Sequence, residues 1–170
     1  MKTKSLWHLS ATSSALLEED LEPAGDNFLE IESLFSLVST GTERLVATGG
    51  VPPALFSQMR VPHQGGEFSF PIKYGYSLVG KVATQGHPLS GKIVHLMHPH
   101  QERCFAAEAD LFLIPEGIPP QRAALSSNLG TAVTAIWDSG ASVGERVAVV
   151  GFGIIGSLVA RLLSLMPAVE

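Results

Sequence analysis

The chain has 170 residues, of which 45% are hydrophobic and 16% charged, so it can bury a core and does not have the composition of a disordered protein. A net charge of −5 without a cluster of Lys and Arg argues against nucleic acid and anionic membranes as partners. The single cysteine, Cys104, excludes an internal disulfide bond and suits a reducing compartment. Without a signal-peptide pattern or a run of ~18 apolar residues, the sequence predicts a cytoplasmic protein.

The first two-thirds of the chain predict short strands separated by turns. Alternation of apolar and polar residues, or a short apolar run between turn residues, indicates a strand at residues 5–10, 27–39, 74–84, 91–97 and 104–114. Glycines inside the third of these strands indicate close approach of another part of the backbone. Strands at this spacing are typical of a small β-barrel or sandwich.

The last third of the chain has a different character. Residues 119–138 have an Ala-rich apolar face that predicts a helix, and the apolar run at 146–150 is typical of a buried parallel strand. A second helix is predicted at 157–166, where Pro167 ends it. We expect a first domain at residues 1–120 and a second domain at 121–170.

Three glycines between the last predicted strand and helix form a G-x-G-x-x-G motif, the dinucleotide-binding fingerprint in its expected context. Gly151 would allow the tight turn, Gly153 the close approach of a pyrophosphate, and Gly156 the close packing of helix and strand. Ile154 and Ile155 lie between the glycines and are included in the cofactor site, and the free N–H groups of the helix that follows would face the phosphates. The motif predicts NAD or NADP as cofactor. The alternative is a tight turn that binds nothing.

The same fingerprint expects an acidic residue about 20 positions after the glycines, where it binds the ribose. Glu170 comes 14 positions after Gly156 and is the last residue. One strand and one helix cannot make a doubly wound sheet. We therefore expect the chain to stop inside a Rossmann domain and to be inactive alone. Its last helix, at 154–166, would then expose apolar surface and favour self-association into a homo-oligomer.

Four segments resemble the medium-chain dehydrogenase/reductase family. They are STGTE at 39–43, YGYSLVGKV at 74–82, LIPEGIP at 113–119 and GERVAVVG at 144–151. PHQ at 99–101 and SNLGTA at 127–132 resemble its zinc-type alcohol dehydrogenase subgroup. The resemblance implies a mostly β fold with α, in which a GroES-like β-barrel precedes the first βα unit of a Rossmann fold. It also implies an NAD(P)-dependent oxidoreductase that moves a hydride to or from a carbonyl, alcohol or activated alkene, a small-molecule substrate.

The family's zinc ligands are not retained in this sequence. Their positions fall on Ser39 or Thr40, on Tyr76, and on or beside Ser127, and none of these is a usual zinc ligand. The family's four-cysteine structural lobe is also missing, because the chain has one cysteine. Zinc is therefore not expected.

The resemblance implies catalytic roles for Tyr76, Thr42 and His100. Tyr76 would hydrogen-bond a substrate carbonyl and donate its proton, and His100 would shuttle a proton. Thr42 would contact the substrate or the nicotinamide ribose, while Glu43 would make a structural ion pair. Thr131 lies on the crossover helix that faces the cofactor in relatives, so we include it in the cofactor site.

Each of these assignments has a structural alternative. Tyr76 could pack against Phe68 or Phe70, and the 39–43 loop could be a turn held by side-chain hydrogen bonds to backbone. The spacing of His95, His98, His100 and Cys104 could make a metal site. We favour exposed turn histidines and a buried cysteine instead. At the level of the whole chain, a non-catalytic GroES-like binding or assembly module is the alternative to an enzyme, and a metal-binding protein is a third hypothesis.

Overall fold

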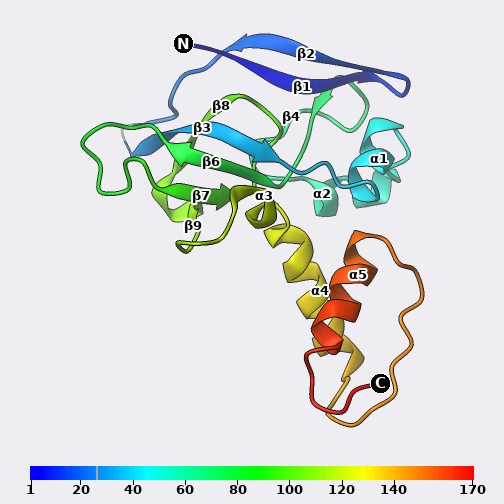
Figure 1. Ribbon diagram of the computed structural model, residues 1–170. Coiled ribbons are helices and arrows are strands. Elements are labelled where there is room, and N and C mark those ends of the chain that lie inside the picture. Colours follow the sequence, from blue (N-terminus) through cyan, green and yellow to red (C-terminus); the bar gives the residue numbers. More distant parts are fainter. Residues whose placement is uncertain (26) are drawn as a thin grey trace. The chain divides into compact units, whose positions relative to one another are not determined.

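The computed structural model describes residues 1–25 and 27–170, which form two compact units, Met1–Ala124 and Leu125–Glu170. The first unit consists of two antiparallel β-sheets with short helices, and the second is built around two longer helices (Figure 1). No helix in the described part of the chain is long and apolar enough to cross a membrane.

One sheet of the first unit has four strands in the order β2-β1-β5-β4. These strands are β1 (Lys2–Ser10), β2 (Ser13–Asp20), β4 (Gly65–Gly66) and β5 (Ile72–Lys73). The strand predicted at 5–10 is confirmed as part of β1, whereas β2 was missed. Because β2 pairs only with β1 and exposes most of its side chains, its sequence has no alternation to reveal it.

The other sheet has five strands in the order β8-β3-β6-β7-β9. These strands are β3 (Phe28–Ser36), β6 (Leu78–Val82), β7 (Ile93–Leu96), β8 (Arg103–Ala107) and β9 (Phe112–Leu113). The strands predicted at 27–39, 74–84 and 91–97 are confirmed with shorter bounds. The strand predicted at 104–114 is two strands, because β8 pairs with β3 and β9 with β7 at opposite edges of the sheet. A 3₁₀ turn at Glu108–Asp110 connects them.

Strand β6 lies at the centre of this sheet and is covered on both faces. Leu78 and Val82 belong to the main apolar core. Its other buried members are Leu29, Ile31, Val94, Leu96, Cys104 and Ala106. Val79 packs on the opposite side with Ala123 of α3 (Pro120–Ala123). The glycine predicted to allow close approach does so, because a Cβ at Gly80 would lie 2.7 Å from the Glu32 carbonyl oxygen of β3.

Short helices and a second apolar cluster complete the first unit. The helices are α1 (Thr42–Ala47), η1 (Pro53–Leu55) and α2 (Phe56–Met59). The second cluster contains Val46, Val51, Phe68, Ile72 and Tyr74. It joins α1 to β5 and to the segment before β6, so it fixes the part of the chain that carries the candidate site.

The helix predicted at 119–138 is interrupted. It consists of α3 and α4 (Ser126–Ser139), with a break at Ala124 and Leu125. The carbonyl of Ala124 accepts a 2.6 Å hydrogen bond from the hydroxyl of Ser77 in the first unit. This carbonyl therefore accepts from a side chain, whereas in an uninterrupted helix it would accept the backbone N–H four residues further on.

The second unit contains α4 and α5 (Ile154–Leu163), and α5 begins three residues before the predicted helix. The strand predicted at 146–150 is wrong. These residues form no strand, and Val150 is 98% exposed. A parallel strand needs neighbouring strands to pair with, and the described residues of this unit provide none. One backbone hydrogen bond joins this segment to Glu170 instead, from Val147 N–H to Glu170 O, and a second runs from Glu170 N–H to the carbonyl of Glu145 just before the segment.

Candidate functional site

A buried carboxylate lies at the start of α1. The side chain of Glu43 is 2% exposed and both its oxygens are engaged. Oε1 accepts a 2.6 Å hydrogen bond from the backbone N–H of Ser39, and Oε2 is 2.5 Å from Nε2 of His100. The resemblance implied an ion pair for Glu43, and the structure shows that His100 is its partner. The hydrogen bond to Ser39 shows that the turn is also held by a side-chain bond to backbone.

His100 is fixed by the chain on several sides. Its carbonyl accepts a hydrogen bond from Leu6 N–H of β1. Gly75 lies against its ring: a Cβ there would be 2.8 Å from Nε2, and the φ of +140° is itself rare for other residues. The remaining ring nitrogen, Nδ1, is buried without a hydrogen-bond partner among the described atoms. In the sequence Gly75 is only one of the glycines inside a predicted strand, and the structure shows that it makes room for this histidine.

The predicted exposure of the turn histidines is wrong. His95, His98 and His100 are 4–6% exposed. Burial lowers the pKa of His98 to about 4, and its ring stacks on that of His63. His95 accepts or donates a hydrogen bond with Ser77 through Nε2, at 3.1 Å. These side chains are buried because paired backbone flanks the turn. Strand β7 pairs with β6 before the turn, and Gln101 pairs with Ser5 of β1 after it.

The buried cysteine is confirmed. Cys104 lies in the main core, and burial raises the pKa of its thiol to about 12. Within residues 1–25 and 27–170, no group of three or more His, Cys, Asp or Glu side chains is arranged to hold a metal ion.

Tyr76 packs in an aromatic environment. It is half-buried, and its ring meets that of Tyr74 edge-on at 6.3 Å. Phe68 and Phe70 belong to the same apolar cluster, as the packing alternative for Tyr76 expected. The hydroxyl of Tyr74 donates a 2.9 Å hydrogen bond to the Met59 carbonyl, and burial, with the nearby Tyr76 and Glu43, raises the pKa of Tyr74 to about 12.

Two further polar residues belong to the surroundings of Glu43. Thr42 is the first residue of α1 and directly precedes Glu43. The ion pair between Glu43 and His100 therefore also fixes the position of Thr42. His8, which sequence reasoning missed, is 7% exposed, and its Nδ1 is 2.7 Å from the hydroxyl of Ser14. Desolvation lowers the pKa of His8, with repulsion from His100 in the same direction and attraction by Glu43 against it. Nothing in the pattern of β1 marks this histidine as different.

The glycine motif forms a sharp turn into α5. Gly151 has a φ of +94°, which strains any other residue, and a Cβ at Gly156 would lie 2.0 Å from the Gly151 carbonyl oxygen, so a side chain at Gly156 would require the backbone to shift. A Cβ at Gly153 would meet nothing within 4 Å. The space beside Gly153 is therefore open, and Gly153 directly precedes the first N–H groups of the helix, at Ile154 and Ile155. This geometry fits a pyrophosphate.

Helix α4, the predicted crossover helix, carries two polar residues of interest, Thr131 and Asn128. Thr131 is exposed, and its hydroxyl donates a 3.2 Å hydrogen bond to the Ser127 carbonyl within α4. Asn128 is 5% exposed, and its Oδ1 has no hydrogen-bond partner among the described atoms. The Thr131 hydroxyl could therefore donate to a ligand only by giving up its helix bond, but its oxygen can still accept a hydrogen bond.

Solved structures with the same fold are oxidoreductases and related proteins. The human synaptic vesicle membrane protein VAT-1 homolog-like protein matches at a TM-score of 0.75 and 18% identity, over 99% of this chain and 54% of that one. The quinone oxidoreductase of Thermus thermophilus, solved also with NADPH, matches at 0.73 and 17%, over 98% and 51%. CAD from Helicobacter pylori, complexed with NADP(H), matches at 0.74 and 13%, over 100% and 58%.

The chain has the fold of a medium-chain dehydrogenase/reductase. The predicted fold class, mostly β with α, is confirmed by the two antiparallel sheets and these matches. The chain spans about half the length of the medium-chain dehydrogenase/reductase structures that it matches. Neither a protein-family model nor a curated protein matches the sequence.

Proposed function

We propose that this chain is part of an NAD(P)-dependent, zinc-independent oxidoreductase of the medium-chain family, acting on a carbonyl, alcohol or activated alkene in the cytoplasm. The observation that carries the proposal is the glycine turn before α5. Gly151 has a positive φ that other residues rarely adopt, Gly156 has no room for a Cβ, and no atom lies within 4 Å of the place of a Cβ at Gly153, directly before the helix. The NADPH and NADP(H) complexes of the Thermus thermophilus and Helicobacter pylori proteins support the same cofactor class.

The residues of this chain would divide the work between cofactor and substrate. The nicotinamide would supply or accept the hydride. The glycine turn and the N–H groups of Ile154 and Ile155 would hold the pyrophosphate, with Thr131 as a further contact. Tyr76 would donate a hydrogen bond to the substrate oxygen, and Thr42 would orient substrate or ribose. His100 would exchange a proton through Nδ1, because Nε2 is engaged by Glu43.

The residues at the family's zinc positions do not fit the metal. Ser39, Thr40, Tyr76 and Ser127 offer hydroxyl groups, whereas catalytic zinc takes thiolate, imidazole or carboxylate ligands. A zinc-independent reaction is therefore the form of the proposal that these side chains support.

The binding test uses NMR spectra of the ¹⁵N-labelled chain during titration with NADPH, NADH and inorganic pyrophosphate. We expect weak binding, with shifts concentrated on the amides of residues 151–156, because the chain spans about half of its structural neighbours. Gly153→Ala should reduce these shifts. Gly130→Ala is the matched control, since a Cβ at Gly130 also meets nothing within 4 Å. Absence of shifts at 151–156 up to millimolar NADPH would contradict the proposal.

A second candidate is a non-catalytic binding or assembly module. This alternative is favoured because two of the proposed catalytic residues make contacts that hold the fold. His100 bonds to Glu43, and Tyr76 packs on Tyr74. In this case nucleotides would leave the spectrum of residues 151–156 unchanged, and Gly153→Ala would have no effect beyond its own neighbours.

A further inference from the structure

The buried pair of Glu43 and His100 leaves one ring nitrogen unused. The two side chains are 2% and 6% exposed, and Glu43 Oε2 lies 2.5 Å from His100 Nε2. His100 Nδ1 is also buried, and it has no hydrogen-bond partner among the described atoms. Most buried polar atoms in proteins are paired, so an unpaired one marks a place where a water molecule or a ligand group belongs.

The chain fixes the geometry of this pair from both sides. Glu43 Oε1 accepts the 2.6 Å hydrogen bond from the Ser39 N–H, so the carboxylate cannot turn without losing that bond. The His100 carbonyl accepts from the Leu6 N–H of β1. Gly75 leaves room for the ring, since a Cβ there would lie 2.8 Å from Nε2. Glu43 and His100 therefore meet through one fixed pair of atoms, Oε2 and Nε2.

The hydrogen-bond chemistry of the pair decides where the histidine proton lies. A neutral imidazole has a proton on one of its two nitrogens, and the other nitrogen is an acceptor. A carboxylate only accepts, so Nε2 of His100 must carry the proton in order to bond to Glu43 Oε2. A proton on Nδ1 would instead be a buried donor without an acceptor. The penalty for such a donor favours the Nε2–H form by about tenfold or more.

We propose that Glu43 is a positioning residue, which keeps the proton of His100 on Nε2 and leaves Nδ1 as a bare acceptor for the hydroxyl group of an alcohol substrate. This inference rests on the proposed oxidoreductase function and narrows its substrate class. A hydroxyl can donate to a bare nitrogen, whereas a carbonyl oxygen only accepts and an alkene has no donor. Among the three proposed classes of substrate, Nδ1 therefore fits an alcohol.

The same arrangement suits His100 to take the proton when the alcohol is oxidised. The O–H bond of the alcohol breaks and an N–H bond forms at Nδ1, while the hydride with its electron pair goes to the oxidised nicotinamide and a carbonyl remains. The imidazolium that forms lies beside the Glu43 carboxylate, which stabilises its positive charge. Glu43 touches neither substrate nor cofactor in this scheme and acts through His100.

Nitrogen NMR of the histidine side chains tests the position of the proton on the intact chain at pH 7. The chain provides an internal reference, because His98 Nδ1 lies 3.0 Å from the Pro99 carbonyl oxygen, which only accepts. His98 should therefore carry its proton on Nδ1 and His100 on Nε2, with at least about nine-tenths of His100 in that form. A proton on His100 Nδ1 would overturn the proposal. This comparison needs no variant, so it decides even if a variant does not fold.

Glu43→Gln separates positioning from packing. The Ser39 N–H needs the amide oxygen of the new side chain, so the amide N–H group faces His100 Nε2 and cannot accept from it. The excess of the Nε2–H form should therefore be lost. Glu19→Gln is the matched control, because Glu19 pairs with Lys73 instead, and it should leave the His100 tautomer unchanged. A Glu43→Gln chain with the wild-type tautomer would also contradict the positioning role.

Two small probes, isopropanol and acetone, test the substrate class in the same spectra. Isopropanol should move the His100 Nδ1 signal towards that of a protonated nitrogen, and acetone should leave it in place. His98 Nε2 reports any general solvent effect. Equal responses of His100 to the two probes, or none, would contradict the alcohol assignment.

The nucleotide titration of residues 151–156 is a separate measurement. The expected tautomer without nucleotide binding would count against the oxidoreductase, whereas nucleotide binding with the proton on Nδ1 would count against Glu43 as a positioning residue.

Discussion

Acid should destabilise the first unit through its buried histidines, and His98 makes the largest resolved contribution. The pKa of His98 is lowered from 6.5 to about 4, chiefly by desolvation. Below pH 6.5 the unfolded chain binds a proton that the folded chain does not, so stability falls as the pH falls. From pH 7 to pH 5 this one residue should cost about 2 kcal/mol, since one pKa unit corresponds to about 1.4 kcal/mol.

Urea unfolding at pH 7, 6 and 5, followed by circular dichroism, measures this dependence. Burial also lowers the pKa values of His8, His63 and His95, so the wild-type loss should exceed that of His98 alone. The His98→Gln chain should lose about 2 kcal/mol less than wild type between pH 7 and pH 5. Equal slopes for wild type and His98→Gln, or a free energy of unfolding that is constant from pH 7 to pH 5, would refute the reasoning.

Three variants, two single and one double, test other features of the structure. Gly75→Ala should destabilise the chain by about 2 kcal/mol in urea unfolding, because of its positive φ and the His100 ring, and a neutral result would contradict that contact. Ile72→Ala should cost about 3 kcal/mol by the same measurement, since Ile72 is fully buried, whereas a loss below about 1 kcal/mol would argue against the second apolar cluster. The double variant Val150→Asp and Phe152→Asp should reduce self-association in sedimentation velocity, because these side chains are 98% and 77% exposed. Leu16→Asp, at an exposed leucine of β2, is its control, and an unchanged sedimentation coefficient of the double variant would refute the role of that surface.

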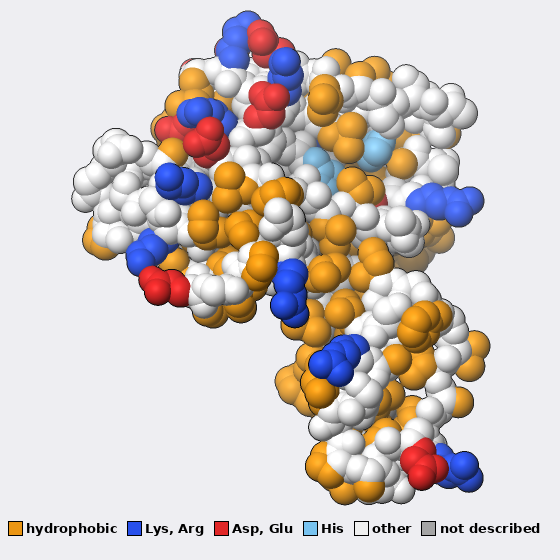
Figure 2. All heavy atoms as spheres, in the orientation of Figure 1, with side chains coloured by type: hydrophobic (Ala, Val, Ile, Leu, Met, Phe, Trp, Pro, Cys, Tyr) orange, Lys and Arg blue, Asp and Glu red, His pale blue; other side chains and the backbone are white. Residues whose placement is uncertain are grey.

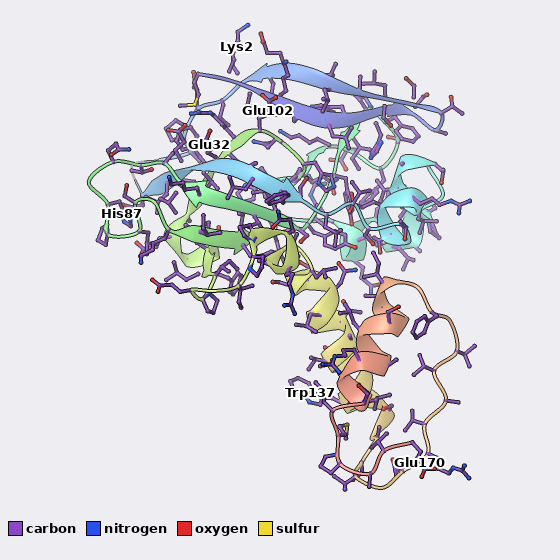
Figure 3. All side chains as sticks on the ribbon, in the orientation of Figure 1. Lys2, Glu32, His87, Glu102, Trp137 and Glu170 are labelled. Atoms are coloured by element: carbon purple, nitrogen blue, oxygen red, sulfur yellow. The ribbon has the colours of Figure 1, made fainter. Side chains whose placement is uncertain are left out.

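The surface of the second unit explains why self-association is expected. Figure 2 shows hydrophobic side chains at several places on the visible face of this unit. Trp137 projects from α4 (Figure 3) and is 76% exposed. The unit exposes Val143 and Leu165 as well. Apolar surface of this extent is unusual on a monomer.

The sequence predicts the elements whose patterns are local. Strands β3 and β6 alternate or form short apolar runs, and the glycine motif requires a turn whatever surrounds it. The glycines inside the third predicted strand were expected to allow close approach, and Gly75 and Gly80 both do. These features depend on neighbours in the chain or on backbone geometry, so no partner needs to be known.

The sequence does not predict features that depend on distant residues. Glu43 and His100 are 57 positions apart, and no spacing rule connects them. The histidines were expected to be exposed because turns usually are, but this turn is covered by β1. The predicted strand at 146–150 has an apolar pattern that becomes a strand only when parallel neighbours are present.

The pairing order of the larger sheet has a consequence for how the chain acquires its structure during synthesis. Strand β3 can pair on both edges only after residues near the middle of the chain have been synthesised, since Ile31 pairs with both Val82 and Cys104. Until the ribosome has released β8, one edge of β3 has no hydrogen-bonding neighbour, and the Leu29 and Ile31 side chains stay in water. Sheets closed by such distant pairs fold slowly. The nascent chain should therefore depend on chaperones until about residue 107 has emerged.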